Sequence, residues 1–128
     1  AAGLPEDKLP EVVYSEESTP PTINDAVMAR RLRTLWREAW GEDRVTSLGA
    51  QGMGAEDFPF FTTEPQVTSV YFSVGGTDAA YLRAARNGSG PAVPPHHSPL
   101  FVIQPESAVT TGIYATVLAL LDLMARRD

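Results

Sequence analysis

Apolar residues recur at three- and four-residue spacing after Asn24, which is the pattern of an amphipathic helix. Asn24 is a favourable N-cap, Asp25 suits the positive end of the helix dipole, and Gly41 ends the pattern. We therefore expect a helix over 25–40 with one apolar face, formed by Met28, Leu32, Leu35, Trp36 and Ala39.

A second apolar stretch begins at Pro105, a residue that suits the first turn of a helix, and continues to about Arg126. The opposite side of this helix also offers little polar surface, so we expect it to be deeply buried against a sheet. It is too short and too interrupted to predict a membrane span. The large apolar residues on its main face are Val109, Ile113, Val117, Leu120, Leu121 and Met124.

Strict alternation over 66–74 predicts a strand, with Val70, Phe72 and Val74 on one face. Shorter β-branched or aromatic runs at 11–16 and 44–48 predict two further strands. Strands mixed with helices in this way predict an α/β fold, part of a mixed sheet covered by helices.

A break in the pattern lies at Pro20-Pro21, because adjacent prolines hold the backbone extended and exclude a helix just before them. We place a domain boundary here, between 1–19 and 20–128. The chain opens on Ala1-Ala2-Gly3, which resembles a helix end with its glycine cap, and lacks an initiating methionine. We therefore expect a piece of a longer chain.

Composition and charge narrow the possible partners. The 128 residues carry a net charge of −6, which disfavours a nucleic-acid or anionic-membrane partner and leaves small neutral or polar ligands open. The chain has no cysteine, which excludes disulfides, thiolate metal sites and cysteine nucleophiles. Its first residues do not resemble a signal peptide, so we expect a cytoplasmic location.

Both histidines of the chain lie between prolines, in the segment Pro94-Pro95-His96-His97-Ser98-Pro99-Leu100-Phe101. Histidine is the commonest metal ligand, although two solvated side chains on a surface loop are an equally simple interpretation. A glycine-rich stretch at 49–55 allows close backbone approach, but it lacks the lysine and hydroxyl of a phosphate loop. The next two residues, Glu56 and Asp57, are either charges at a helix start or the rim of a functional site.

Three segments in order, Pro20-Pro21-Thr22-Ile23-Asn24-Asp25, Met53-Gly54-Ala55-Glu56-Asp57-Phe58 and His97-Ser98-Pro99-Leu100-Phe101, resemble the C-terminal part of a family of metal-dependent amidohydrolases. The family is typified by hippurate hydrolase, N-acyl-amino-acid amidohydrolases and indole-acetyl-amino-acid hydrolases. It belongs to the metallopeptidase superfamily of aminoacylase and the bacterial zinc carboxypeptidases.

The resemblance implies a di-metal catalytic domain, of the exopeptidase type, with an inserted ferredoxin-like lid that mediates dimerisation. Residues 1–19 would then be the end of the lid, and 20–128 the C-terminal portion of the catalytic domain. It implies that His97 is a metal ligand, whereas His96 is outside the motif. It also makes Gly54, Glu56, Asp57 and Ser98 candidates for lining the substrate pocket or supporting the metal ligands.

The implied cofactors are two divalent ions, commonly zinc, manganese or cobalt, which polarise the scissile amide and activate a water. The implied substrates are N-acyl amino acids or related small amides. The glutamate base and most metal ligands are expected upstream, so the missing N-terminal part of the enzyme is the expected partner. One imidazole cannot hold a catalytic metal tightly, and we expect this fragment alone to be inactive.

Two other interpretations stay open. A stand-alone binding or regulatory module could retain part of the amidohydrolase fold without its catalytic half. An unrelated α/β domain could contain His97-Ser98-Pro99 by chance. For a truncated sheet we also expect an unpaired edge and exposed apolar surface, with association of the lone chain.

Overall fold

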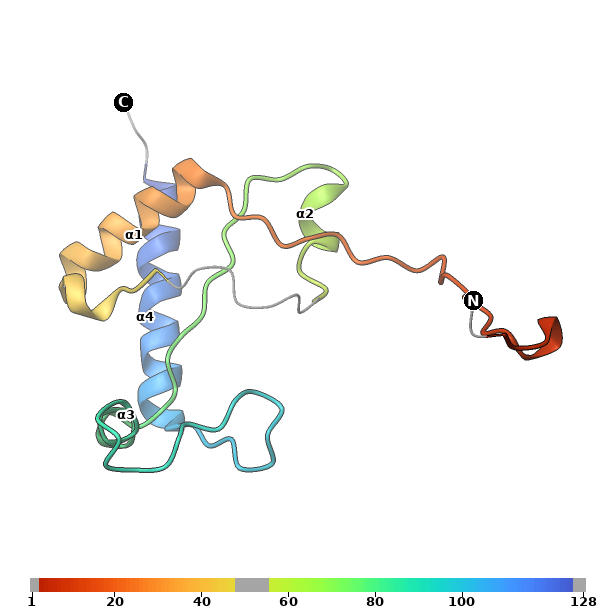
Figure 1. Cartoon of the computed structure of the whole chain (residues 1–128). Coiled ribbons are helices and arrows are strands. Elements are labelled where there is room, and N and C mark those ends of the chain that lie inside the picture. Colours follow the sequence, from red (N-terminus) through yellow and green to blue (C-terminus); the bar gives the residue numbers. More distant parts are fainter. Residues whose placement is uncertain (1–2, 48–55, 126–128) are drawn as a thin grey trace.

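The computed structural model describes residues 3–47 and 56–125, and within these ranges every regular element is a helix. Two long helices, α1 (Ala26–Trp40) and α4 (Pro105–Met124), pack across one another (Figure 1). The shorter elements are the helices α2 (Phe60–Thr63) and α3 (Ala79–Arg86) and the 3-10 turns η1 (Glu6–Lys8) and η2 (Glu42–Arg44).

The predicted α/β fold with a mixed sheet is wrong for this structure. The described residues contain no strand, and their one β-bridge joins Thr63 to Gln66 across a tight turn. A strand is stable only when its backbone pairs with a neighbour, so alternation along one segment does not by itself produce a sheet.

Residues 66–74, predicted as a strand, run as an extended segment beside α4 and belong to no sheet (Figure 1). The face predicted to carry Val70, Phe72 and Val74 nevertheless contacts the helices. Val70 lies against the core, the Phe72 ring centroid is 4.8 Å from that of Trp36, and Val74 approaches Gly112 of α4. The alternation thus identified a face that packs, but its partners are helices and not strands.

The other two predicted strands are also absent from the described residues. Residues 11–16 belong to an N-terminal arm, residues 3–22, that extends away from the helices (Figure 1), and Tyr14 is 87% exposed there. Arg44 is the last residue of the 3-10 turn η2, residues 45–47 follow it, and Leu48 lies outside the described residues.

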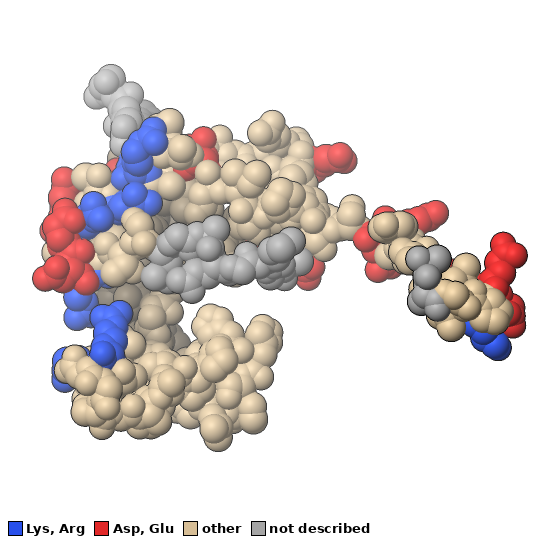
Figure 2. Space-filling view, in the orientation of Figure 1, with Lys and Arg blue, Asp and Glu red and all other residues tan. Residues whose placement is uncertain are grey.

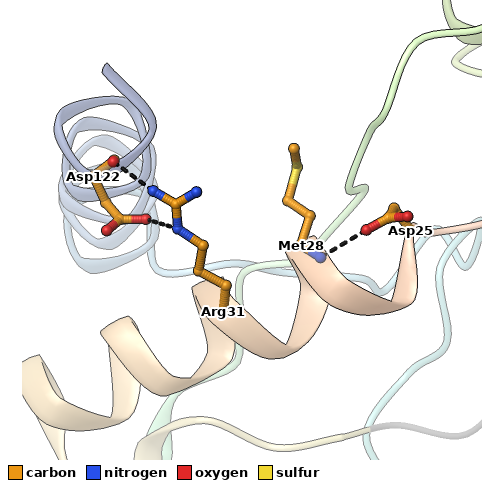
Figure 3. A network of polar contacts seen from close by, with 4 residues as sticks. All are labelled: Asp25, Met28, Arg31 and Asp122. Atoms are coloured by element: carbon orange, nitrogen blue, oxygen red, sulfur yellow. Dashed lines mark hydrogen bonds and ion pairs between the residues drawn. The ribbon is translucent and has the colours of Figure 1, made fainter. Parts of the chain in front are cut away.

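Helix α1 confirms the prediction for 25–40 almost to the residue. Its N-cap is Asp25, whose Oδ1 accepts from the Met28 backbone N at 2.7 Å (Figure 3). Asn24, the predicted cap, instead pairs with Tyr71: Asn24 Nδ2 donates to the Tyr71 carbonyl at 2.8 Å, and the Tyr71 N donates to Asn24 Oδ1 at 2.7 Å. Gly41 ends the helix with φ 91°, a backbone angle that favours glycine.

The core is a small contact between α1 and α4, formed by Leu32, Trp36, Ala115 and Ala119. Trp36 Nε1 donates to the Ala115 carbonyl at 3.0 Å, which satisfies the buried indole N–H. Nearby, the Arg31 guanidinium holds both the carboxylate and the carbonyl of Asp122, at 2.6 Å each (Figure 3). Alanines let the helix backbones approach closely enough for these bonds.

The expected deep burial of α4 is wrong. The side that packs on α1 carries small residues, while the large apolar residues predicted to be buried are 44–78% exposed. In the described structure no sheet is present to cover them. With 20 residues and a mean hydropathy of 1.5, α4 also has the length and composition to cross a membrane, contrary to expectation, although core helices of soluble proteins share these properties.

The whole chain has an open arrangement. Its accessible surface is 11086 Å². A compact protein of 13.8 kDa exposes about 6,600 Å². The expectation of exposed apolar surface is therefore met, on the arm as well as on α4.

Candidate functional site

His97 lies at the third position of a tight turn. The Ser98 backbone N donates to the Pro95 carbonyl at 3.1 Å and closes this turn. His97 has φ 68° and is the one non-glycine residue with positive φ among the described residues. Positive φ at the third residue but not at the second is the feature of a type II turn, in which glycine is usual at that position. The turn therefore presents an imidazole where the backbone alone would favour glycine.

The two adjacent histidines differ in their surroundings. The His96 ring packs edge-on against Phe101, with centroids 4.9 Å apart. The His97 side chain is exposed and has no hydrogen-bond partner in the described part of the chain. The His96 side chain is exposed as well, so among the described residues the two rings differ in the contact with Phe101 and not in exposure.

Ser98 closes the loop that carries the histidines. Its hydroxyl oxygen accepts from the Leu100 N at 3.1 Å, and its carbonyl accepts from the Phe101 N at 3.0 Å. Its side chain therefore fixes the conformation of the segment that follows His97. The predicted supporting role of Ser98 is compatible with these bonds, which act on the backbone.

A recess of about 350 Å³ adjoins the same loop, near the start of α3. This volume is at the lower end of the range for small-molecule pockets. Asp78 at its edge caps α3, because its Oδ1 accepts from the Ala80 and Tyr81 N atoms at 2.9 Å. The recess is lined by Thr77, Asp78, Tyr81, Val93, Pro94, Leu100, Phe101, Val102 and Gln104.

The loop is also electrically neutral, a feature that the sequence prediction missed. From Asn87 to Pro105 the chain contains no aspartate, glutamate, lysine or arginine. Figure 2 shows the corresponding part of the surface without charged side chains. This long uncharged run was visible in the sequence and indicates a surface suited to an apolar or neutral group.

Glu56 joins two of the segments that carry the family resemblance. One carboxylate oxygen accepts from the Thr22 hydroxyl, and the other accepts from the Phe58 N at 3.3 Å. The Phe58 ring in turn lies 5.2 Å from the ring of Tyr71. Glu56 is half-buried and committed to these bonds, whereas the neighbouring Asp57 is exposed.

The candidate residues fall into two separate groups. His97 and Ser98 lie at the N-terminal end of α4, and Glu56 and Asp57 lie close to α2, away from that end (Figure 1). Gly54, the fifth candidate, lies outside the described residues. Across residues 3–47 and 56–125, no three histidine, aspartate or glutamate side chains are grouped to hold a metal ion. His97 is the candidate ligand, and its partners in a metal site are not among its neighbours.

No family model matches the chain. No solved structure matches it either.

Proposed function

We propose that the chain is the C-terminal portion of a metal-dependent amidohydrolase that cleaves N-acyl amino acids or related small amides. The proposal rests on the three segments that resemble this family, and in particular on His97. We assign His97 as a ligand of the metal centre.

The observation that carries the proposal is the exposed imidazole of His97 at a left-handed backbone position. Non-glycine residues at such positions concentrate at functional sites, because the local cost persists only where the side chain is needed. Pro95 and the bonds of Ser98 hold the turn, and the ring of His96 is directed onto Phe101. The left-handed backbone is therefore the feature that distinguishes His97 from His96, and it supports His97 as the metal ligand.

The recess beside the loop supports an acyl substrate. Five of its lining residues are apolar, and the loop itself is uncharged, so an aliphatic or aromatic acyl group would remove apolar surface from water by entering it, which is favourable. The free amide of Gln104 and the hydroxyl of Thr77 at its edge are suited to hydrogen bonding with a substrate amide.

A divalent ion bound at the complete site would polarise the amide carbonyl and lower the pKa of a water. In this chain His97 contributes one neutral nitrogen ligand, and Ser98 and Pro95 hold its position. The general base and the remaining ligands would come from the upstream part of the enzyme. The chain alone would be inactive.

The test uses the complete natural gene product that contains this sequence. We expect it to bind divalent metal and hydrolyse hippurate, and we expect His97→Ala to lower kcat/KM by about 100-fold or more with loss of bound metal. His96→Ala is the matched control and should change activity less than about threefold. Metal content by mass spectrometry and product release by chromatography give the two readouts.

Equal effects of the two substitutions would contradict the assignment of His97. A gene product without metal and without amidase activity would contradict the enzyme proposal as a whole and favour a non-catalytic module.

A further inference from the structure

Helix α4 has two different apolar faces. The face toward α1 carries the small residues Ala115 and Ala119. On the opposite side lies a stripe of large residues, here called the outer stripe, which falls within an arc of about 80° at 100° per residue. The outer stripe consists of Val109, Ile113, Val117, Leu120 and Met124, all of them exposed.

The outer stripe is large enough to form an interface. With Leu121 at its margin, its exposed fractions correspond to about 700 Å², compared with about 300–600 Å² for the largest apolar patch on a typical monomer. Two such stripes facing each other would bury about 1,400 Å² in total, within the range of about 1,200–2,000 Å² for a stable interface.

We propose that the outer stripe binds the same stripe of a second copy of this chain, with the two α4 helices antiparallel and a two-fold axis at Val117. A two-fold interface requires a self-complementary surface, and an uncharged apolar stripe meets this requirement. No charged side chain interrupts it between Glu106 and Asp122, and Asp122 points to Arg31 on the α1 side.

The spacing of the stripe fits this arrangement. Val109 and Met124 lie eight residues before and seven after Val117, and Ile113 and Leu120 lie four before and three after it. In an antiparallel pair, Val109 therefore faces Met124 of the second copy, and Ile113 faces Leu120. Each pair places a β-branched residue against a longer, unbranched or γ-branched one.

The helix dipole favours the antiparallel direction. Antiparallel pairing brings opposite helix-dipole ends together, whereas parallel pairing brings like ends together.

This interface goes beyond the proposed function and is independent of it. The outer stripe contains none of the candidate site residues. In the antiparallel pair the two His97 loops lie at opposite ends of the helix pair, since each loop precedes the N-terminus of its own α4. Loss of metal binding would leave the dimer intact, and loss of the dimer would leave His97 unchanged.

The absence of cysteine from the chain makes disulfide mapping direct. Val117→Cys, on the axis, should form a covalent dimer under mild oxidation, because Cα atoms within about 7 Å can be bridged. Val109→Cys alone should not, but a mixture of Val109→Cys and Met124→Cys chains should. Val13→Cys, in the exposed N-terminal arm, is the control and should remain monomeric on a denaturing gel.

Self-dimerisation of Val109→Cys as fast as that of Val117→Cys would show a parallel pair and overturn the proposed arrangement.

Sedimentation equilibrium of the unmodified chain provides the second test. We expect a dimer at micromolar concentration, and Val117→Glu should weaken it by about 30-fold or more, because a charge in the centre of the interface is desolvated. Val13→Glu should leave the dimer unchanged, and circular dichroism of both variants checks that α1 and α4 remain folded.

A monomer at 100 μM would overturn the proposal. So would co-sedimentation of the chain with phosphatidylcholine vesicles that Val117→Glu abolishes, because the outer stripe would then be a membrane-binding surface.

Discussion

At the scale of single residues, His97 combines an accessible side chain with a disfavoured backbone. Its φ of 68° lies in the left-handed region, which histidine tolerates better than most residues but glycine adopts freely. Replacing His97 with glycine should therefore remove the imidazole and at the same time relieve the backbone strain. If the chain becomes more stable but loses its function, His97 is needed for its side chain and not for the turn.

We predict that His97→Gly raises the free energy of unfolding by about 0.5–1 kcal/mol, because glycine carries no penalty at positive φ. His96→Gly should instead lower it, since the ring contact with Phe101 is lost and the backbone gains freedom. Urea titration followed by circular dichroism compares the two. A His97→Gly chain less stable than the unmodified one would show that the imidazole supports the turn.

The sequence distinguished the histidines only through the family resemblance, because they are adjacent residues of the same type between Pro95 and Pro99. The edge-on contact of His96 with Phe101 depends on the geometry of the turn, which cannot be predicted from the spacing of apolar residues along the sequence. Similarly, the role of Glu56 depends on Thr22, which lies 34 residues earlier in the chain. Chemistry-bearing residues could be named from the sequence, but their partners could not.

At the scale of elements, prediction succeeded where the signal is local. Helix α1 has its cap, its apolar face and its terminating glycine within its own stretch, and its bounds were predicted almost to the residue. The single shift, from Asn24 to Asp25 as the cap, arises because Asn24 pairs with the distant Tyr71.

Prediction failed where an element needs a partner. The segment 66–74 has the alternation of a strand, and α4 has the apolarity of a buried helix, but neither property specifies what covers it. In the described chain, segment 66–74 packs onto helices, and the face of α4 that carries large apolar side chains stays exposed to solvent. The mixed sheet was inferred from local alternation in single segments. Residues 3–47 and 56–125 contain no neighbouring strand with which such a segment could form a sheet.

The contact between α1 and α4 depends on small side chains. We predict that Ala115→Leu lowers the free energy of unfolding by about 1–3 kcal/mol, because the larger side chain separates the helices and breaks the bond from Trp36 Nε1 to the Ala115 carbonyl. Tyr114→Leu, on the same helix but 60% exposed, should change it by less than about 0.5 kcal/mol.

Urea unfolding, monitored by tryptophan fluorescence and circular dichroism, measures both variants. Equal stabilities for the Ala115 and Tyr114 variants would show that α1 and α4 do not pack through this face.

At the scale of the whole molecule, the open arrangement predicts a weak response to denaturant. A chain of 13.8 kDa exposes about 20,000 Å² when unfolded and about 6,600 Å² when compact. From 11086 Å², unfolding exposes about two-thirds as much new surface as it would from a compact fold. We predict an m-value in urea about two-thirds of that typical for this length.

The monomeric Val117→Glu variant is the suitable sample, because a dimer would add buried surface of its own. An m-value equal to that of a compact protein of 128 residues would contradict the open arrangement.

The core contact also has a consequence for synthesis on the ribosome. The Trp36–Ala115 bond and the Arg31–Asp122 pair join residues 79 and 91 positions apart, so the core of α1 is incomplete until α4 has been made, even though Phe72 can contact Trp36 earlier. At translation rates of about 5–20 residues per second, the apolar face of α1 waits about 4–16 seconds for Ala115. During that interval the nascent chain depends on chaperones, or on an upstream domain already folded, to cover Leu32 and Trp36.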